Sequence, residues 1–261
     1  MKISEYHRPQ TLEKALALLG RTEIVTMPLG GGTFLNSPAS VEYFPSNDIA
    51  VVDLQALELN TIERNATFIN LGATATLQAI LDISGLPEAF YRAVRNETTY
   101  NLRQVATVAG TQVAADGRSP FATVMLALDA HLTILPDEEA ISLGDLLPFR
   151  FERLHRRLIT KISIPASARL AYEYVARTPA DQPIVCASVA RWPSGRTRLS
   201  LGGYGSEPML VMDGPESGGV EVAARAAFSQ AGDEWASAEY RADMAVVLTN
   251  RCLAKLASAE G

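Results

Sequence analysis

The sequence predicts an α+β protein, and two observations support this prediction. In residues 1–165, short strand and helix patterns are mixed without the regular repeat of about 30 residues that a doubly wound parallel sheet produces. From residue 166 onward, three consecutive strand patterns are followed by two helix patterns. We therefore predict two domains, residues 1–165 and residues 166–261, and the second is a small antiparallel three-stranded sheet with helices.

The first domain begins with an amphipathic helix. Leucine and alanine recur at helical spacing between residues 12 and 19, where Thr11 can cap the first turn and Gly20 can end the last. An uninterrupted apolar run at residues 49–54 predicts a strand that is buried on both faces. The other elements that we predict here are strands at 24–27, 67–73 and 131–135 and helices at 76–83, 87–94 and 121–128.

The second domain follows a boundary near Pro165. The segment Trp192–Arg196 contains Pro and Gly between two apolar runs, which is typical of a hairpin loop. A stretch rich in Gly at residues 213–219 is expected to be a loop. The elements that we predict in this domain are strands at 172–176, 184–191 and 197–202 and helices at 220–230 and 240–257.

Composition excludes several classes of function. The 261-residue chain is 48% hydrophobic and carries a formal net charge of −6, which argues against nucleic-acid binding because that requires clustered Lys and Arg. The densest basic run, Arg150–Arg157, is interrupted by Glu152, and we interpret it as a solvated face.

The sequence also gives no sign of a membrane span or of a metal site. No apolar stretch approaches the roughly 18 residues of a membrane helix, and the N-terminus lacks the apolar core of a signal peptide, so we expect a cytoplasmic protein. Cys186 and Cys252 lie in apolar surroundings and are expected to be small core residues. Because no Cys/His cluster is present, we predict no zinc or iron–sulfur site in this chain.

Two glycine-centred segments, both of which we predict to be loops, are the candidate binding elements. Glycine permits positive φ and lets bare backbone N–H groups close on an anion, so each segment could hold a phosphate. Two such segments in one domain suit a ligand with two phosphates, such as a dinucleotide. The predicted site residues are Leu29, Gly30, Gly31, Gly32, Thr33, Phe34 and Leu35 in the first segment, Thr107, Val108, Ala109, Gly110 and Thr111 in the second, and Asp116 and Ser119 behind it.

The common glycine-loop motifs do not match these segments. A P-loop needs Lys after its last Gly, and a Rossmann fingerprint needs a third Gly where this chain has Leu35. Taken alone, the three glycines of the first segment are at least as consistent with a tight turn that binds nothing. The histidines at positions 7, 131 and 155 are scattered and no Gly-x-Ser-x-Gly motif is present, so we predict no catalytic side chain.

Together, the two segments resemble a known family, the FAD-binding medium subunits of molybdenum hydroxylases of the carbon monoxide and xanthine dehydrogenase type. The first segment resembles the family's A-G-G-T-D-L motif, and Asn101–Gly110 resembles its I-R-N-x-A-T-V-G-G motif. Further on, Leu158–Pro165 resembles the strand that closes the flavin domain, and Leu201–Pro208 resembles a G-G-V-G-x-x-P turn. The resemblance covers nearly the whole chain in the same order.

The resemblance implies a fold, a cofactor and partners. The first domain would be a two-lobed FAD-binding domain of the vanillyl-alcohol-oxidase-like type, with the FAD pyrophosphate on the backbone amides of residues 30–34, Gly110 and Thr111. The partners would be a large molybdopterin-binding subunit and a small [2Fe–2S] subunit. Electrons would pass from the clusters through FAD to an acceptor such as NAD, quinone or oxygen.

The chain also departs from the family's pattern. Phe34 stands in place of a polar residue, and Thr111 in place of an Asn that normally helps to hold the cofactor. Pro120 stands in place of an Asp that contacts the cofactor, and Asp116 could take over that contact. Tyr174 stands in place of a Lys near the flavin ring. These departures leave open an alternative function, a scaffold subunit that binds flavin weakly or not at all. A stand-alone flavoenzyme ranks last, because no polar catalytic cluster is evident.

Overall fold

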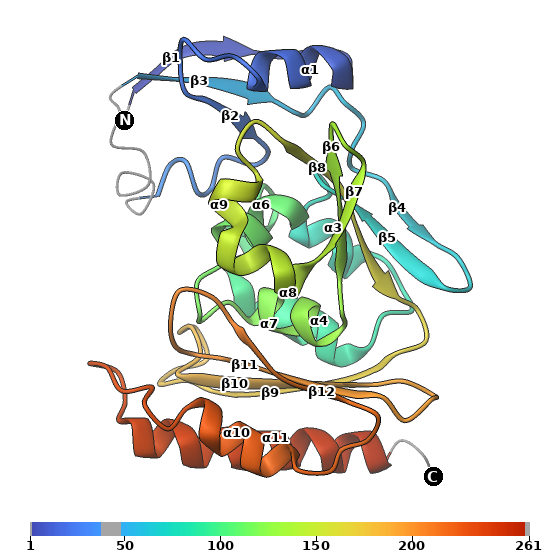
Figure 1. Cartoon of the computed structure of the whole chain (residues 1–261), viewed down its shortest axis with the longest axis vertical. Coiled ribbons are helices and arrows are strands. Elements are labelled where there is room, and N and C mark those ends of the chain that lie inside the picture. Colours follow the sequence, from blue (N-terminus) through green and yellow to red (C-terminus); the bar gives the residue numbers. More distant parts are fainter. Residues whose placement is uncertain (1, 38–47, 259–261) are drawn as a thin grey trace.

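The computed structural model describes residues 2–37 and 48–258, which form three layers stacked along the longest axis (Figure 1). The first layer is a parallel sheet of three strands in the order β1-β3-β2, with helix α1 packed against it. Its elements are β1 (Lys2–His7), α1 (Leu12–Leu19), β2 (Thr26–Leu29) and β3 (Asp48–Asp53).

Local sequence explains most of this N-terminal lobe. Thr11 caps α1, as predicted, by accepting a hydrogen bond from the backbone N–H of Lys14 at 3.3 Å. Strand β3 is central in its sheet and buried on both faces from Ile49 onward, which confirms the prediction from its apolar run. Strand β1 was not predicted, because it is an edge strand with mostly exposed polar side chains.

The second layer is a lobe built on an antiparallel sheet of five strands in the order β4-β5-β8-β6-β7. The strands are β4 (Ile62–Arg64), β5 (Phe68–Gly72), β6 (His131–Leu135), β7 (Glu139–Ser142) and β8 (Leu158–Pro165). The helices around them are α3 (Leu77–Asp82), α4 (Glu88–Glu97), α5 (Tyr100–Arg103), α6 (Val108–Ala114), α7 (Pro120–Ala127), α8 (Leu143–Leu146), the short 3₁₀ helix η1 (Leu147–Phe149) and α9 (Arg150–Arg153).

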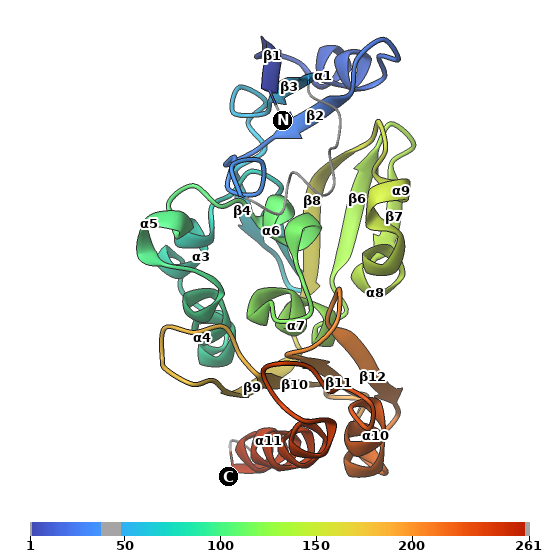
Figure 2. The same ribbon diagram turned by 90° about the vertical axis from the view of Figure 1, so that its left-hand side faces the viewer.

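The third layer is an antiparallel sheet in the order β12-β11-β10-β9, and α10 and α11 cover its outer face (Figures 1 and 2). The predicted α+β class is confirmed, but this sheet has four strands where we expected three. The fourth strand includes Asp213 and Gly214, which we had placed in a loop. The elements of this layer are β9 (Arg169–Val175), β10 (Val185–Arg191), β11 (Thr197–Gly202), β12 (Met209–Gly214), α10 (Val220–Ala227) and α11 (Ala238–Ser258).

Helix α7 joins the second and third layers. All eight of its residues are buried, and it contacts α4 on one side and β10 and β11 on the other. The rings of Phe90 and Phe121 meet edge to face with centroids 5.7 Å apart. The largest apolar core accordingly continues from the five-stranded sheet across α7 to Tyr172 and Cys186 in the third layer. Both cysteines are buried and free, as predicted.

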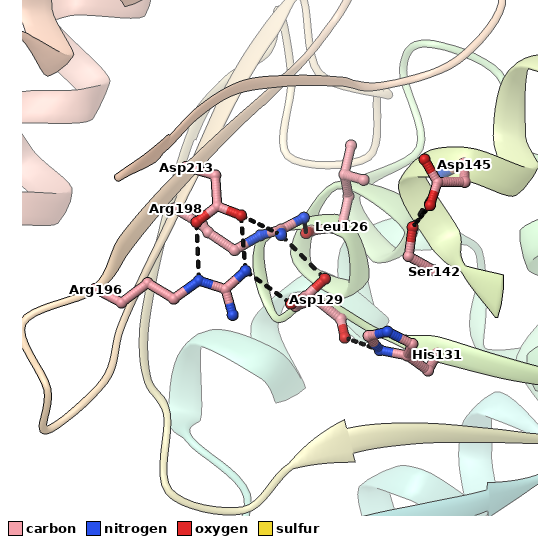
Figure 3. Close-up of polar contacts among 8 residues, drawn as sticks. All are labelled: Leu126, Asp129, His131, Ser142, Asp145, Arg196, Arg198 and Asp213. Atoms are coloured by element: carbon pink, nitrogen blue, oxygen red, sulfur yellow. Dashed lines mark hydrogen bonds and ion pairs between the residues drawn. The ribbon is translucent and has the colours of Figure 1, made fainter. Parts of the chain in front are cut away.

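The C-terminal end of α7 is held by a group of ion pairs from the third layer (Figure 3). Arg198 donates to the backbone carbonyl of Leu126 at 3.2 Å and lies 3.0 Å from Asp129. Arg196 bridges Asp129 and Asp213, and its hydrogen bonds hold the pKa of Asp213 below its ordinary value. Asp129 lies two residues beyond the end of α7, whereas Arg196 immediately precedes β11 and Arg198 lies within it, so these contacts join the two layers.

The structure also bears on the question of a membrane span. Within residues 2–37 and 48–258, no helix is both long and apolar enough to cross a bilayer.

Replacing Phe121 by Ala tests whether α7 holds the layers together. The ring is fully buried, so its removal should lower the free energy of unfolding by about 3–5 kcal/mol. Phe68→Ala is the matched control, because that ring is 44% exposed on β5 and its loss should cost less than about 1 kcal/mol. Urea unfolding followed by circular dichroism measures both. Equal losses in the two variants would contradict a central role for α7.

Candidate functional site

A cleft of about 360 Å³ lies between the N-terminal lobe and the second lobe. Its walls are β2 with the glycine-rich segment that follows it, the start of α6, and the chain from α9 into β8. The predicted site residues that line this cleft are Leu29, Gly30, Gly31, Gly32, Thr33, Phe34, Leu35, Thr107, Ala109 and Gly110. The structure thus brings both glycine-centred segments to one cleft.

The first segment fits against the second because it has no side chains at two positions. A Cβ atom on Gly31 would lie 1.6 Å from the backbone oxygen of Val105, and one on Gly30 would lie 2.7 Å from Oγ1 of Thr107. Gly32 has φ of 72°, in the left-handed region that glycine adopts without strain. The backbone of the segment can therefore approach the start of α6 only if these positions are glycine.

The backbone N–H groups of the first segment are available for a ligand. No described residue accepts a hydrogen bond from the N–H of Gly31, Gly32 or Thr33. The chain then forms one helical turn, in which the N–H of Asn36 donates to the carbonyl of Gly32 at 3.1 Å. Successive free N–H groups at the start of a helical turn are a favourable place for an anion.

The second segment is the first turn of helix α6 and not a loop as predicted. Thr107 caps this helix, and its Oγ1 accepts a hydrogen bond from the N–H of Gly110 at 3.2 Å. The N–H of Thr111 donates to the carbonyl of Thr107 at 2.8 Å. Val108 is fully buried, and neither it nor Thr111 lines the cleft. The two amides that we expected to meet a pyrophosphate thus already have protein acceptors.

Asp116 and Ser119 also lie outside the cleft. Asp116 is exposed and accepts a hydrogen bond from the backbone N–H of Arg118 at 2.8 Å. Ser119 is buried, caps α7, and donates to the carboxyl group of Glu97 at 2.8 Å. Glu97 also accepts from the N–H of Phe121 at 2.8 Å, so it completes the N-terminal cap of α7. Burial raises the pKa of Glu97 to about 7.

The cleft is lined by basic side chains although the chain as a whole is acidic. Arginine side chains and one histidine line it, and no Asp or Glu among the described residues does. The basic lining residues are Arg21, Arg150, His155, Arg156 and Arg157. A ligand that carries negative charge is therefore favoured at this place in a protein with a net charge of −6.

The interpretation of Arg150–Arg157 as a solvated face was wrong for Arg150. This side chain is buried and donates to the carbonyls of Val113 at 3.0 Å and Ala115 at 2.9 Å, at the C-terminal end of α6. It also donates to the carbonyl of Ser206, 3.2 Å away, and lies 3.3 Å from Glu207. Sequence reasoning missed these basic residues, because a short charged run carries no local sign of the distant carbonyls that it meets.

Comparison with known proteins identifies a matching family. Residues 1–167 match the family described as the FAD binding domain in molybdopterin dehydrogenase. The Escherichia coli protein YgfM is 27% identical over 211 residues, which cover 81% of this chain and 78% of that protein.

Solved structures show the same fold. CO dehydrogenase from Oligotropha carboxidovorans is similar with a TM-score of 0.79 at 23% identity, and the match covers 95% of this chain and 96% of that chain. Quinoline 2-oxidoreductase from Pseudomonas putida 86 is similar with a TM-score of 0.78 at 19% identity, and the match covers 99% of each chain.

Replacing Glu97 by Gln should change how stability depends on pH. The pKa of the carboxyl group is about 7 in the folded protein against an ordinary value of 4.5. Between these values the unfolded chain loses the proton while the folded chain keeps it, so wild-type stability falls as pH rises through this window and the variant escapes that loss. The difference should be on the order of 3 kcal/mol across the window. Urea unfolding at a series of pH values measures it.

If the difference in unfolding free energy between the two proteins stays constant across that pH window, the carboxyl group of Glu97 does not carry the raised pKa.

Proposed function

This chain belongs to the family of FAD binding domains in molybdopterin dehydrogenase, and from that premise we propose that it is the FAD-binding electron-transfer subunit of a molybdenum-dependent hydroxylase. In this proposal it works in a cytoplasmic complex with a large molybdopterin-binding subunit and a small [2Fe–2S] subunit. Electrons would come from the partner clusters and leave to an external acceptor such as NAD, quinone or oxygen. FAD is the cofactor of this family, and it supplies the redox chemistry that no side chain provides.

The observation that carries the proposal is the chemistry of the cleft. The cleft presents the free backbone N–H groups of Gly31, Gly32 and Thr33, and its lining contains arginine and no described acidic residue. These donors fit the two phosphates of a dinucleotide, because fixed N–H groups and guanidinium groups both bind phosphate oxygens without a further partner. The residues present therefore fit FAD.

The chain's own residues would bind and orient the cofactor. The segment from Gly31 to Thr33 would hold the phosphates, and its position is fixed by close packing against Val105. Apolar side chains such as Met27, Leu54 and Leu158 line the same cleft and would keep water from the rest of the ligand. We propose cofactor-binding roles for the other predicted residues, but those of Val108, Thr111, Asp116 and Ser119 would have to be indirect, because they do not line the cleft.

Two observations favour the alternative, a scaffold subunit that binds flavin weakly. The N–H groups of Gly110 and Thr111 donate to Thr107, so they contribute no free donors to the cleft. Pro120, which begins α7, has neither a carboxylate nor an N–H. Under this alternative the fold would be kept to join the partner subunits.

Flavin retention tests the proposal directly. The purified chain, mixed with FAD and then desalted, should keep a flavin absorbance band. Gly31→Ala should lose it, because the added methyl group collides with the oxygen of Val105 and displaces the phosphate-binding segment. Gly144→Ala is the matched control: the new methyl group would lie 3.4 Å from Leu126, an ordinary contact away from this cleft, so the band should remain.

The same experiment separates the two functions. If the wild-type chain keeps no flavin at any FAD concentration, the scaffold function replaces the redox function. If Gly31→Ala retains as much flavin as wild type, the first segment does not hold the phosphates.

The partner proposal is tested by purification from the native cell. A tagged chain should co-purify with one subunit that contains molybdopterin and one that contains [2Fe–2S] clusters, in equal amounts. Metal analysis and mass spectrometry of the purified material measure this. Recovery of the chain alone, with redox activity of its own, would overturn the partner proposal.

A further inference from the structure

We propose that Arg156 is the side chain that recognises the phosphates of the dinucleotide, and this inference rests on the proposed function. Arg156 lies in the turn between α9 and β8 and lines the same cleft as the first glycine segment. The segments before and after it belong to the second lobe, whereas the glycine segment belongs to the N-terminal lobe. Arg156 therefore lines the cleft from the second lobe, whereas the free N–H groups belong to the segment from Gly31 to Thr33 in the N-terminal lobe.

The other arginines of the cleft already have partners. Arg21 makes hydrogen bonds to Glu5 at 2.6 and 3.2 Å. Arg157 pairs with Asp137 and Glu139, and Arg150 is saturated by backbone carbonyls. Among the described residues, none accepts a hydrogen bond from Arg156 or forms an ion pair with it. Of the four arginines in the cleft, it is thus the one whose guanidinium is available to a ligand.

The backbone at Arg156 is held in an unusual conformation. Its φ is 59°, in the left-handed region that residues with a side chain rarely adopt. The turn is fixed by the N–H of Arg157, which donates to the carbonyl of Leu154 at 3.1 Å. Strain of this kind is common where the surrounding structure positions a residue for function.

The negative charge of two phosphates requires a positively charged partner, and Arg156 can provide it. The amides of Gly110 and Thr111 are occupied by Thr107, so the first segment supplies uncharged donors from one wall only. Two phosphates also need positive charge close by, and a guanidinium binds phosphate through two parallel hydrogen bonds. Arg156 would therefore make the cleft select ligands with a diphosphate over those without one.

Binding measurements with two variants test this inference. Arg156→Gln should weaken FAD binding about tenfold and flatten its dependence on salt concentration, since one screened charge contact is lost. Arg153→Gln is the matched control, because Arg153 is exposed on α9, pairs with Glu139 at 3.5 Å and does not line the cleft. Quenching of flavin fluorescence measures affinity, and the thermal unfolding midpoint without ligand shows that both variants fold.

Two further ligands separate this inference from the proposed function. ADP carries the same diphosphate without a flavin, and Arg156→Gln should weaken its binding, measured by calorimetry, by the same factor. Riboflavin has no phosphate, so its affinity should not change.

If wild type binds FAD and Arg156→Gln binds it equally well with the same salt dependence, the inference is overturned and the proposed function stands. If wild type binds ADP but not FAD, the proposed function fails and the ADP comparison decides the role of Arg156. If neither ligand binds wild type, both are overturned.

Discussion

The burial of helix α7 on every side is the constraint on which the rest of the structure depends. A helix without a polar face must be surrounded, and here α4 and the sheet β12-β11-β10-β9 surround it. Its backbone ends then need partners that water cannot supply. Glu97 and Ser119 serve the N-terminal end, while Arg198 and Ser200 donate to the carbonyls of Leu126 and Thr123. Buried polar residues of the second and third layers thus satisfy the backbone groups of α7.

The cleft depends on a second constraint, the close approach of the N-terminal lobe to the start of α6. The absence of a side chain at Gly31 allows it, and Arg150 fixes the other end of α6 through the carbonyls of Val113 and Ala115. Helix α6 is therefore held at both ends before any ligand is present. A binding surface held in this way loses little entropy when a ligand is bound.

The sequence was most informative where local chemistry decides the structure. The cap of Thr11, the buried run of β3 and the glycines of the first segment all depend on near neighbours, and they were predicted with nearly correct limits. The glycine-rich start of α6 looked like a loop, because its helical state depends on hydrogen bonds from Val108 and Ala109 to the distant Ala75 and Ala73. The sequence of the segment itself does not indicate such distant hydrogen-bond partners.

The same limit applies to the site. Leu29 to Leu35 reached the cleft as expected, whereas Asp116 and Ser119 did not, because the chain turns after α6 toward the third layer. The arginines were missed for a related reason. Arg150 is buried and has five hydrogen-bond acceptors, whereas Arg153 is exposed to solvent. The sequence around the two residues does not distinguish them, because most of the acceptors of Arg150 come from distant parts of the chain.

The position of Arg150 has a consequence for how such chains can evolve. Its guanidinium donates to the carbonyl of Ala115, at the end of α6, and to the carbonyl of Ser206, in the third layer. One side chain of the second lobe thus satisfies carbonyls in both layers. Recombination that exchanged the C-terminal layer with that of a distant relative would remove the acceptor at Ser206 from this buried cation. It would also remove the donors Arg198 and Ser200 from the backbone carbonyls of α7. The layers are therefore expected to be inherited as one unit, and substitutions at their seam should occur in compensating pairs.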